Sequence, residues 1–246
     1  LDWHGNMKNY INSKFKVFLK QKKGQISILN SKYKKYFKKK KLMGKLITPS
    51  LKNYLEIKSK IRNSYLKLDI NDENMSFTLI ISKLLGISKK SFLSSLNTFE
   101  GLPHRYETFF KRKNCVFIND SKATTFQASK FALKSSKNTY WIVGGLNKKK
   151  DKIKLNELKK NIIKAYIIGK NTTFFKKQLN NKVDYYVAGS LKNSLIRIFK
   201  DIELKKNKKN TILLSPASAS YDQYSNFEKR GEEFKKLSKI YARKYI

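Results

Sequence analysis

Short apolar runs alternate with amphipathic stretches from Gly101 to the end of the chain, and this alternation constrains the fold more than any other feature. The short runs are typical of buried strands, whereas the longer stretches carry apolar residues at helical spacing. Such alternation indicates βαβ units, which build a mostly parallel α/β sheet with helices on both faces. We expect strands at 106–110, 115–118, 139–143, 165–168, 184–187 and 211–214, and helices at about 124–134, 154–162, 172–179, 189–200 and 225–242.

The first hundred residues show a weaker pattern. Apolar side chains at helical spacing predict helices at 7–20, 73–86 and 88–97, and short apolar runs predict strands at 25–30, 45–47, 53–57 and 64–68. The rhythm changes at Gly101. We therefore expect two domains, 1–99 and 100–246, each long enough to form a core.

The chain carries a formal net charge of +39, which raises the question of a nucleic-acid partner. Of its 56 basic residues only six are arginines, and the lysines are spread over every segment. Nucleic-acid-binding proteins favour arginine and gather their charge on one face. The pattern is instead typical of an AT-rich coding bias acting on exposed positions, so we expect no nucleic-acid partner. A basic α/β module that binds RNA or DNA is the alternative.

Cysteine content and hydropathy bear on the cellular compartment. Cys115 is the only cysteine, so no internal disulfide can form and a reducing compartment is expected. The chain has no run of 18 apolar residues and does not open with a signal-peptide pattern. We therefore expect a cytoplasmic protein with no membrane partner.

Three clusters of polar and small residues directly follow predicted strands. They lie at 119–122, 144–148 and 215–220. In parallel α/β sheets, ligands bind beyond the carboxyl ends of the strands. The three clusters therefore predict one binding site at that edge of the sheet.

The last cluster runs into a predicted helix within the segment LLSPASASYDQYSNFEKRGEEF, residues 213–234. Ser225 and Glu228 have the spacing of a capping box, and so do Thr124 and Gln127 after the first cluster. Serine hydroxyls and free backbone N–H groups at the start of a helix are suited to binding an anion. The segment therefore predicts an anion-binding site.

Each of these features also has a purely structural interpretation. Capping of the next helix explains Asp120 and Thr124 equally well, and His104 with Arg105 fits a structural hinge. A Gly-Gly turn such as 144–145 is common in unrelated proteins. No feature decides the function alone.

Taken together, the motifs resemble one family in their order and spacing. The motifs GLPHR (101–105), INDSKAT (118–124), a Gly-Gly pair followed by Lys148, and the segment 213–234 are similar to the carboxyl-terminal domain of the Mur ligases. Within that family the resemblance is best to the branch that adds D-glutamate. The opening, LDWHGNMKNYINSK, is similar to the second half of the family's central ATP-binding domain.

The resemblance implies a Rossmann-like carboxyl-terminal domain that binds the amino acid, preceded by the incomplete second half of an α/β ATPase domain. It implies an ADP-forming ligase that uses ATP and Mg²⁺ to join D-glutamate to UDP-N-acetylmuramoyl-L-alanine through an acyl phosphate. This reaction belongs to peptidoglycan precursor synthesis, and the full-length enzyme would be a monomer. A Mur ligase that adds a different amino acid is the second alternative.

The resemblance also implies roles for individual residues. The set that would bind the two carboxylates of D-glutamate is Thr124 and Lys148 for the α-carboxylate, and Ser220, Tyr221 and Phe227 for the other. The set that would contact the nucleotide is Asn74, Arg105 and Asp120. The implied catalytic residues are Lys122 and Lys14. Lys14 would carry a carbamate that binds magnesium, and a solvated helix lysine is the alternative for it.

Two departures from the family pattern change what we expect of this chain. It contains no GxxxxGK[ST] phosphate loop, so we expect the carboxyl-terminal part of a longer enzyme that is inactive alone. On the predicted helix at 73–86, Glu73 and Phe77 replace family residues and only Asn74 matches. The adenine contacts of that helix are therefore not expected to follow the family.

Overall fold

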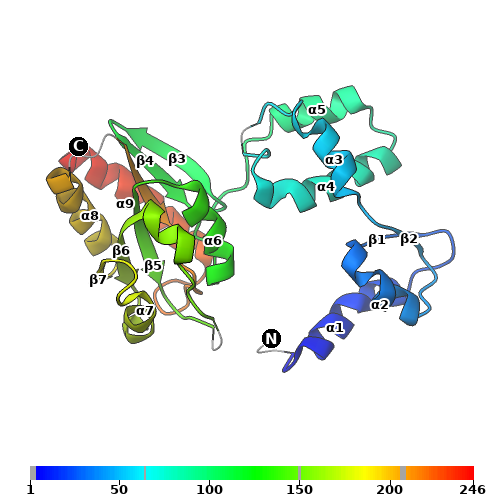
Figure 1. The fold of residues 1–246 in the computed structure, drawn as a ribbon, viewed down its shortest axis with the longest axis horizontal. Coiled ribbons are helices and arrows are strands. Elements are labelled where there is room, and N and C mark those ends of the chain that lie inside the picture. Colours follow the sequence, from blue (N-terminus) through cyan, green and yellow to red (C-terminus); the bar gives the residue numbers. More distant parts are fainter. Residues whose placement is uncertain (1–3, 64, 149–150, 206–208) are drawn as a thin grey trace. The chain divides into compact units, whose positions relative to one another are not determined.

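The computed structural model describes residues 4–63, 65–148, 151–205 and 209–246. The chain divides into two compact units, an amino-terminal unit (Leu1–Glu100) and a carboxyl-terminal unit (Gly101–Ile246) (Figure 1). Each unit has a hydrophobic core of its own.

The carboxyl-terminal unit is built on a six-stranded sheet with the order β3-β4-β8-β5-β6-β7. The strands are β3 (Glu107–Arg112), β4 (Cys115–Asn119), β5 (Thr139–Gly144), β6 (Ile162–Ile168), β7 (Tyr185–Gly189) and β8 (Asn210–Leu214). All neighbours from β4 to β7 pair in parallel, which confirms the predicted α/β class. β3 is antiparallel to β4 because a tight turn joins them, in which Lys113 adopts a φ of +45°.

Helices cover both faces of this sheet. They are α6 (Phe126–Ser135), α7 (Thr172–Leu179), α8 (Leu191–Lys205) and α9 (Phe227–Tyr245). α6 and α7 contribute to the core on one face, and α8 and α9 to the core on the other (Figure 1). The helix expected at 154–162 is instead a short 3₁₀ helix, Asn156–Asn161. Leu155 and Leu158 both face the core there, at the three-residue spacing of a 3₁₀ turn.

The central strand β5 shows how the sequence pattern sets the packing. All six of its residues are buried. Trp141 and Val143 belong to one core, whereas Tyr140 and Ile142 belong to the other. This alternation follows from the two-residue period of a strand. Because β5 is held on both faces, the loop that leaves its carboxyl end starts from a rigid position.

The amino-terminal unit is mostly helical. Its elements are α1 (Met7–Leu19), β1 (Ile26–Ile28), η1 (Ser31–Tyr33), α2 (Lys34–Lys39), β2 (Lys45–Ile47), α3 (Leu51–Lys58), η2 (Asp69–Asn71), α4 (Asp72–Leu84) and α5 (Lys89–Asn97). β1 and β2 pair in parallel, and α3, α4 and α5 share one core. In the part of the chain that the structure describes, no helix combines the length and the apolar character needed to cross a bilayer.

Two strands expected in this unit are wrong. Residues 53–57 lie within α3, where Tyr54 and Ile57 are buried three positions apart on one helix face. This burial at helical spacing overrides the local preference of a short apolar run for strand. Of the strand expected at 64–68, Ser64 lies outside the described residues and the remainder forms turns.

The first turns of α9 pack against His104. This residue is buried, has a φ of +63°, and its Nδ1 lies 3.0 Å from Asn119 Nδ2. A Cβ atom at Gly231 would overlap the His104 ring. Gly231 therefore allows α9 to approach the end of β4, with the His104 ring packed between them.

We predict that Gly231→Ala lowers the free energy of unfolding by about 1–3 kcal/mol, because overpacking outweighs the gain in helix propensity. In a His104→Ala background the same substitution should instead stabilise the protein by up to about 1 kcal/mol, the propensity gain alone. Urea unfolding of the four proteins measures both effects. Equal effects in the two backgrounds would show that the ring does not limit this position.

Candidate functional site

The loop between β8 and α9, residues 215–226, connects the carboxyl ends of the parallel strands. The Ser215 hydroxyl donates to Asp120 Oδ2 at 2.6 Å, just beyond β4. Leu146, beyond β5, and Ala219 exchange two backbone hydrogen bonds of 2.9 and 3.0 Å. The polar clusters that the sequence predicts to meet at this edge are thus joined directly to one another.

Arg230, in the first turns of α9, forms hydrogen bonds with the loops that follow β4 and β8. Its side chain is 1% exposed, and its Nη2 donates to the carbonyl oxygens of Ser121 (2.8 Å) and Ser218 (3.1 Å). Its Nε donates to the Ser121 hydroxyl at 3.0 Å, and that hydroxyl donates to the Phe227 carbonyl at 2.8 Å. One guanidinium therefore links the loops after β4 and β8. Sequence reasoning missed this role, although Arg230 belongs to the segment 213–234.

Asp120 is the most strongly perturbed carboxyl group at this edge. It is 9% exposed, and its Oδ1 accepts the Tyr106 N–H at 3.1 Å. Burial raises the pKa of Asp120 to about 7, against the lowering effects of the Ser215 and Tyr106 hydrogen bonds and of Arg105. Arg105 itself is exposed. A carboxyl group with this pKa changes its charge near neutral pH.

Both expected helix caps are wrong by one residue. The N-cap of α6 is Thr125, whose Oγ1 accepts the Ala128 N–H, and not Thr124. The N-cap of α9 is Asn226, whose Oδ1 accepts the Lys229 N–H at 2.7 Å, and not Ser225. The cap is set by which side chain reaches the N–H three positions on, and neighbouring hydroxyl and amide residues are equally suited to this.

These shifts leave hydrogen-bonding groups available at the edge. The Thr124 hydroxyl has no hydrogen-bond partner among the described residues. The Asn226 side chain accepts only the Lys229 N–H, and the N–H groups of Phe227 and Glu228 have no acceptor in the described part of the chain. Unpaired N–H groups and the helix dipole favour an anion at this point.

The predicted cations and hydroxyls lie on the same loops. Lys122 is exposed, with its Nζ 4.7 Å from the centre of the Phe227 ring. Lys148 is exposed two residues beyond the Leu146–Ala219 bridge, and Ser220, only 3% exposed, directly follows that bridge. Tyr221 is 71% exposed. The carboxyl edge thus brings hydroxyls, lysines and free N–H groups together on connected loops.

Two predicted site residues belong to the amino-terminal unit. Lys14 is exposed on α1, with its Nζ 5.5 Å from the centre of the Tyr10 ring. Asn74 is exposed on α4, and the neighbouring Glu73 accepts a hydrogen bond from Asn30. Among the described residues, no group of three or more His, Cys, Asp or Glu side chains is arranged to hold a metal ion.

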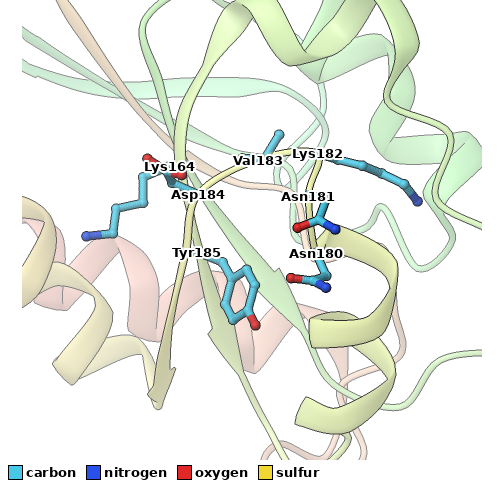
Figure 2. A pocket seen from close by; sticks show the side chains of 7 residues that line it. All are labelled: Lys164, Asn180, Asn181, Lys182, Val183, Asp184 and Tyr185. Atoms are coloured by element: carbon cyan, nitrogen blue, oxygen red, sulfur yellow. The ribbon is translucent and has the colours of Figure 1, made fainter.

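A separate pocket lies near the amino-terminal ends of β6 and β7. It has a volume of about 590 Å³ and is formed by Lys164 and the residues that lead from α7 into β7 (Figure 2). These residues are Asn180, Asn181, Lys182, Val183, Asp184 and Tyr185. Because the strands are parallel, the pocket is at the opposite end of the sheet from the polar clusters. It is not part of the candidate site.

The raised pKa of Asp120 predicts a pH-dependent stability. Between an unfolded pKa of about 4 and the folded value, the unfolded chain releases a proton that the folded chain retains. The stabilisation is therefore complete at low pH and is lost as the pH rises through about 7. In Asp120→Asn this component should disappear, which urea unfolding below, within and above this window measures. An unchanged pH profile would contradict the assignment.

Comparison with known proteins identifies the family. No protein-family model matches the chain. It is 36% identical over 249 residues to the UDP-N-acetylmuramoylalanine–D-glutamate ligase of Wolbachia sp. subsp. Brugia malayi, a match that covers 95% of this chain and 50% of the relative. The ligase of the same name from Caulobacter vibrioides is 32% identical over 260 residues, covering 96% and 55%. The chain thus spans about half the length of the curated relatives it matches.

Solved structures agree on the fold. MurF from Acinetobacter baumannii has a TM-score of 0.54 at 11% identity, covering 71% of this chain and 38% of that one. A bifunctional folylpolyglutamate synthase/dihydrofolate synthase from Yersinia pestis has a TM-score of 0.56 at 11% identity, covering 100% and 59%. The predicted resemblance is therefore confirmed: the chain belongs to the Mur ligase family and matches the carboxyl-terminal part of its members.

Proposed function

We propose that this chain is the amino-acid-binding part of an ATP-dependent ligase that joins D-glutamate to UDP-N-acetylmuramoyl-L-alanine in peptidoglycan precursor synthesis. The names of the relatives support this choice of substrates. The observation that carries it is the carboxyl edge of the sheet, where Lys122, Lys148 and the free N–H groups of α9 lie on connected loops. Such an edge suits a small dianion.

D-Glutamate places specific demands on such a site. Its two carboxylates need separate anion-binding groups, so that only the amine is directed at the activated carbonyl carbon. In our proposal, Thr124 and Lys148 hold the α-carboxylate, with Lys122 close by. Ser220 and the backbone N–H groups of Tyr221 and Phe227 hold the other carboxylate. Hydrogen bonds from charged or backbone donors to carboxylates are among the stronger ones in proteins.

The nucleotide side of the proposal involves fewer groups. The residues proposed for nucleotide binding are Arg105 and Asp120 in the carboxyl-terminal unit and Asn74 in the amino-terminal unit. Mg²⁺, when bound, would offset the negative charge of the transferred phosphoryl group. Lys14, as a carbamate, would supply one oxygen ligand, and the described residues offer no further cluster. The ligands therefore fit only in part. We further propose that the full-length enzyme is cytoplasmic and monomeric.

The substrate assignment predicts a specific kinetic defect. In a chimera that joins the amino-terminal half of the Wolbachia relative to this chain, D-glutamate should stimulate ADP formation. Ser220→Ala or Lys148→Ala should raise the KM for D-glutamate by about 10- to 100-fold, since each removes a hydrogen bond to a charged group. The KM for ATP should change little. Lys236→Ala, an exposed lysine on α9, is the matched control. An unchanged KM for D-glutamate in both variants would remove the assignment.

The carbamate on Lys14 predicts a signal that does not depend on activity. With ¹³C-labelled bicarbonate, the full chain should show a carbamate carbon resonance that is lost in Lys14→Ala and kept in Lys16→Ala, its neighbour on α1. In the chimera, Lys14→Ala should lose activity that short carboxylic acids partly restore. A spectrum that is the same in both variants, without rescue, would leave Lys14 as a solvated helix lysine.

A further inference from the structure

The second half of the loop between β8 and α9 is a closed turn on the surface. The Ser220 carbonyl accepts the N–H groups of Gln223 (3.0 Å) and Tyr224 (2.8 Å). Tyr221, within this turn, is 71% exposed. The first half of the loop is held by buried contacts with the ends of β4 and β5, but this turn extends beyond them. Its position therefore depends on other contacts.

Asp222 provides one of these contacts. Its Oδ2 accepts the Lys170 N–H at 2.8 Å, just beyond β6. Gly169, with a φ of +80°, makes this approach possible, because a Cβ atom there would overlap the Asp222 carboxylate. The backbone at Gly169 and Lys170, directly after β6, therefore leaves space for the Asp222 side chain and donates a hydrogen bond to it.

Gln223 provides the second contact. Its Nε2 donates to the Gly189 carbonyl at 2.8 Å, at the carboxyl end of β7. Gly189 also accepts the Gly169 N–H at 3.0 Å, so the two strand exits are themselves joined. Asp222 and Gln223 therefore form hydrogen bonds at the ends of the adjacent strands β6 and β7. Together with its contacts at β4, β8 and β5, the loop contacts the ends of all five parallel strands.

We propose that Asp222 and Gln223 form a clamp that positions Ser220 for the side-chain carboxylate of the amino-acid substrate. Both are positioning residues, since neither is assigned a contact with substrate. Ordering a mobile backbone costs conformational entropy, so a turn that is already fixed binds its ligand with less loss of entropy. The identity of the ligand rests on the proposed function, whereas the clamp rests on the contacts alone.

The test uses the full chain and two measurements. Asp222→Ala should speed hydrogen exchange of the backbone amides of Gln223, Tyr224 and Lys170, which are hydrogen-bonded in this structure. It should also weaken D-glutamate binding in an NMR titration about tenfold, equivalent to about 1.4 kcal/mol. Asp222→Asn keeps an acceptor oxygen and should restore both. Asp184→Ala, which removes an exposed carboxylate before β7, should change neither.

The outcomes separate the clamp from its ligand. Exchange in Asp222→Ala as slow as in the wild type would overturn the clamp. Faster exchange with unchanged D-glutamate affinity would overturn its positioning role. If the wild type binds no D-glutamate, and the chimera shows no D-glutamate-dependent ADP formation, the proposed function fails while faster exchange in Asp222→Ala still supports the clamp.

Discussion

One buried cation organises the carboxyl edge of the sheet. Burial of the Arg230 guanidinium carries a large desolvation cost, which must be offset by good hydrogen bonds. The three acceptors it uses are neutral oxygens of Ser121 and Ser218 rather than a carboxylate. Burial lowers the pKa of Arg230 to about 10, so it stays charged at neutral pH. The loops after β4 and β8 are therefore placed by a group that itself never reaches the surface.

The position of α9 follows from the same contact. Arg230 lies in the first turns of the helix, and Gly231 next to it allows close packing against His104. The helix therefore begins directly behind the loop that carries Ser220. Unpaired N–H groups at its start, with Lys122 over the Phe227 ring, are the groups on which our proposal of an anion-binding site at this edge rests.

Part of the positive charge of the chain lies in ion pairs away from these loops. Several basic side chains are paired for structural reasons: Lys164 bonds Asp201 at 2.8 Å, and Lys235 bonds Glu107 at 2.5 Å. These ion pairs join α8 to β6 and α9 to β3. The lysines that bear on the proposed chemistry are distinguished by their place beyond the strand ends, not by their number. Net charge describes solubility and association, and says little about the site.

The sequence by itself determined the parallel sheet, the order of its strands and helices along the chain, the clusters at the strand ends and the family, because periodicity and motif spacing are local properties of a chain. Tertiary structure alone decided that 53–57 is helical, that Thr125 and Asn226 are the caps, and that Arg230 is buried. The burial of Arg230 depends on partners far away in sequence, such as Ser121, which lies 109 positions from it. Each cap is instead selected between two neighbouring side chains that both suit the N–H three positions on. The spacing of residues in the sequence does not show which of several suitable side chains forms a given hydrogen bond, because that depends on how the chain packs in three dimensions.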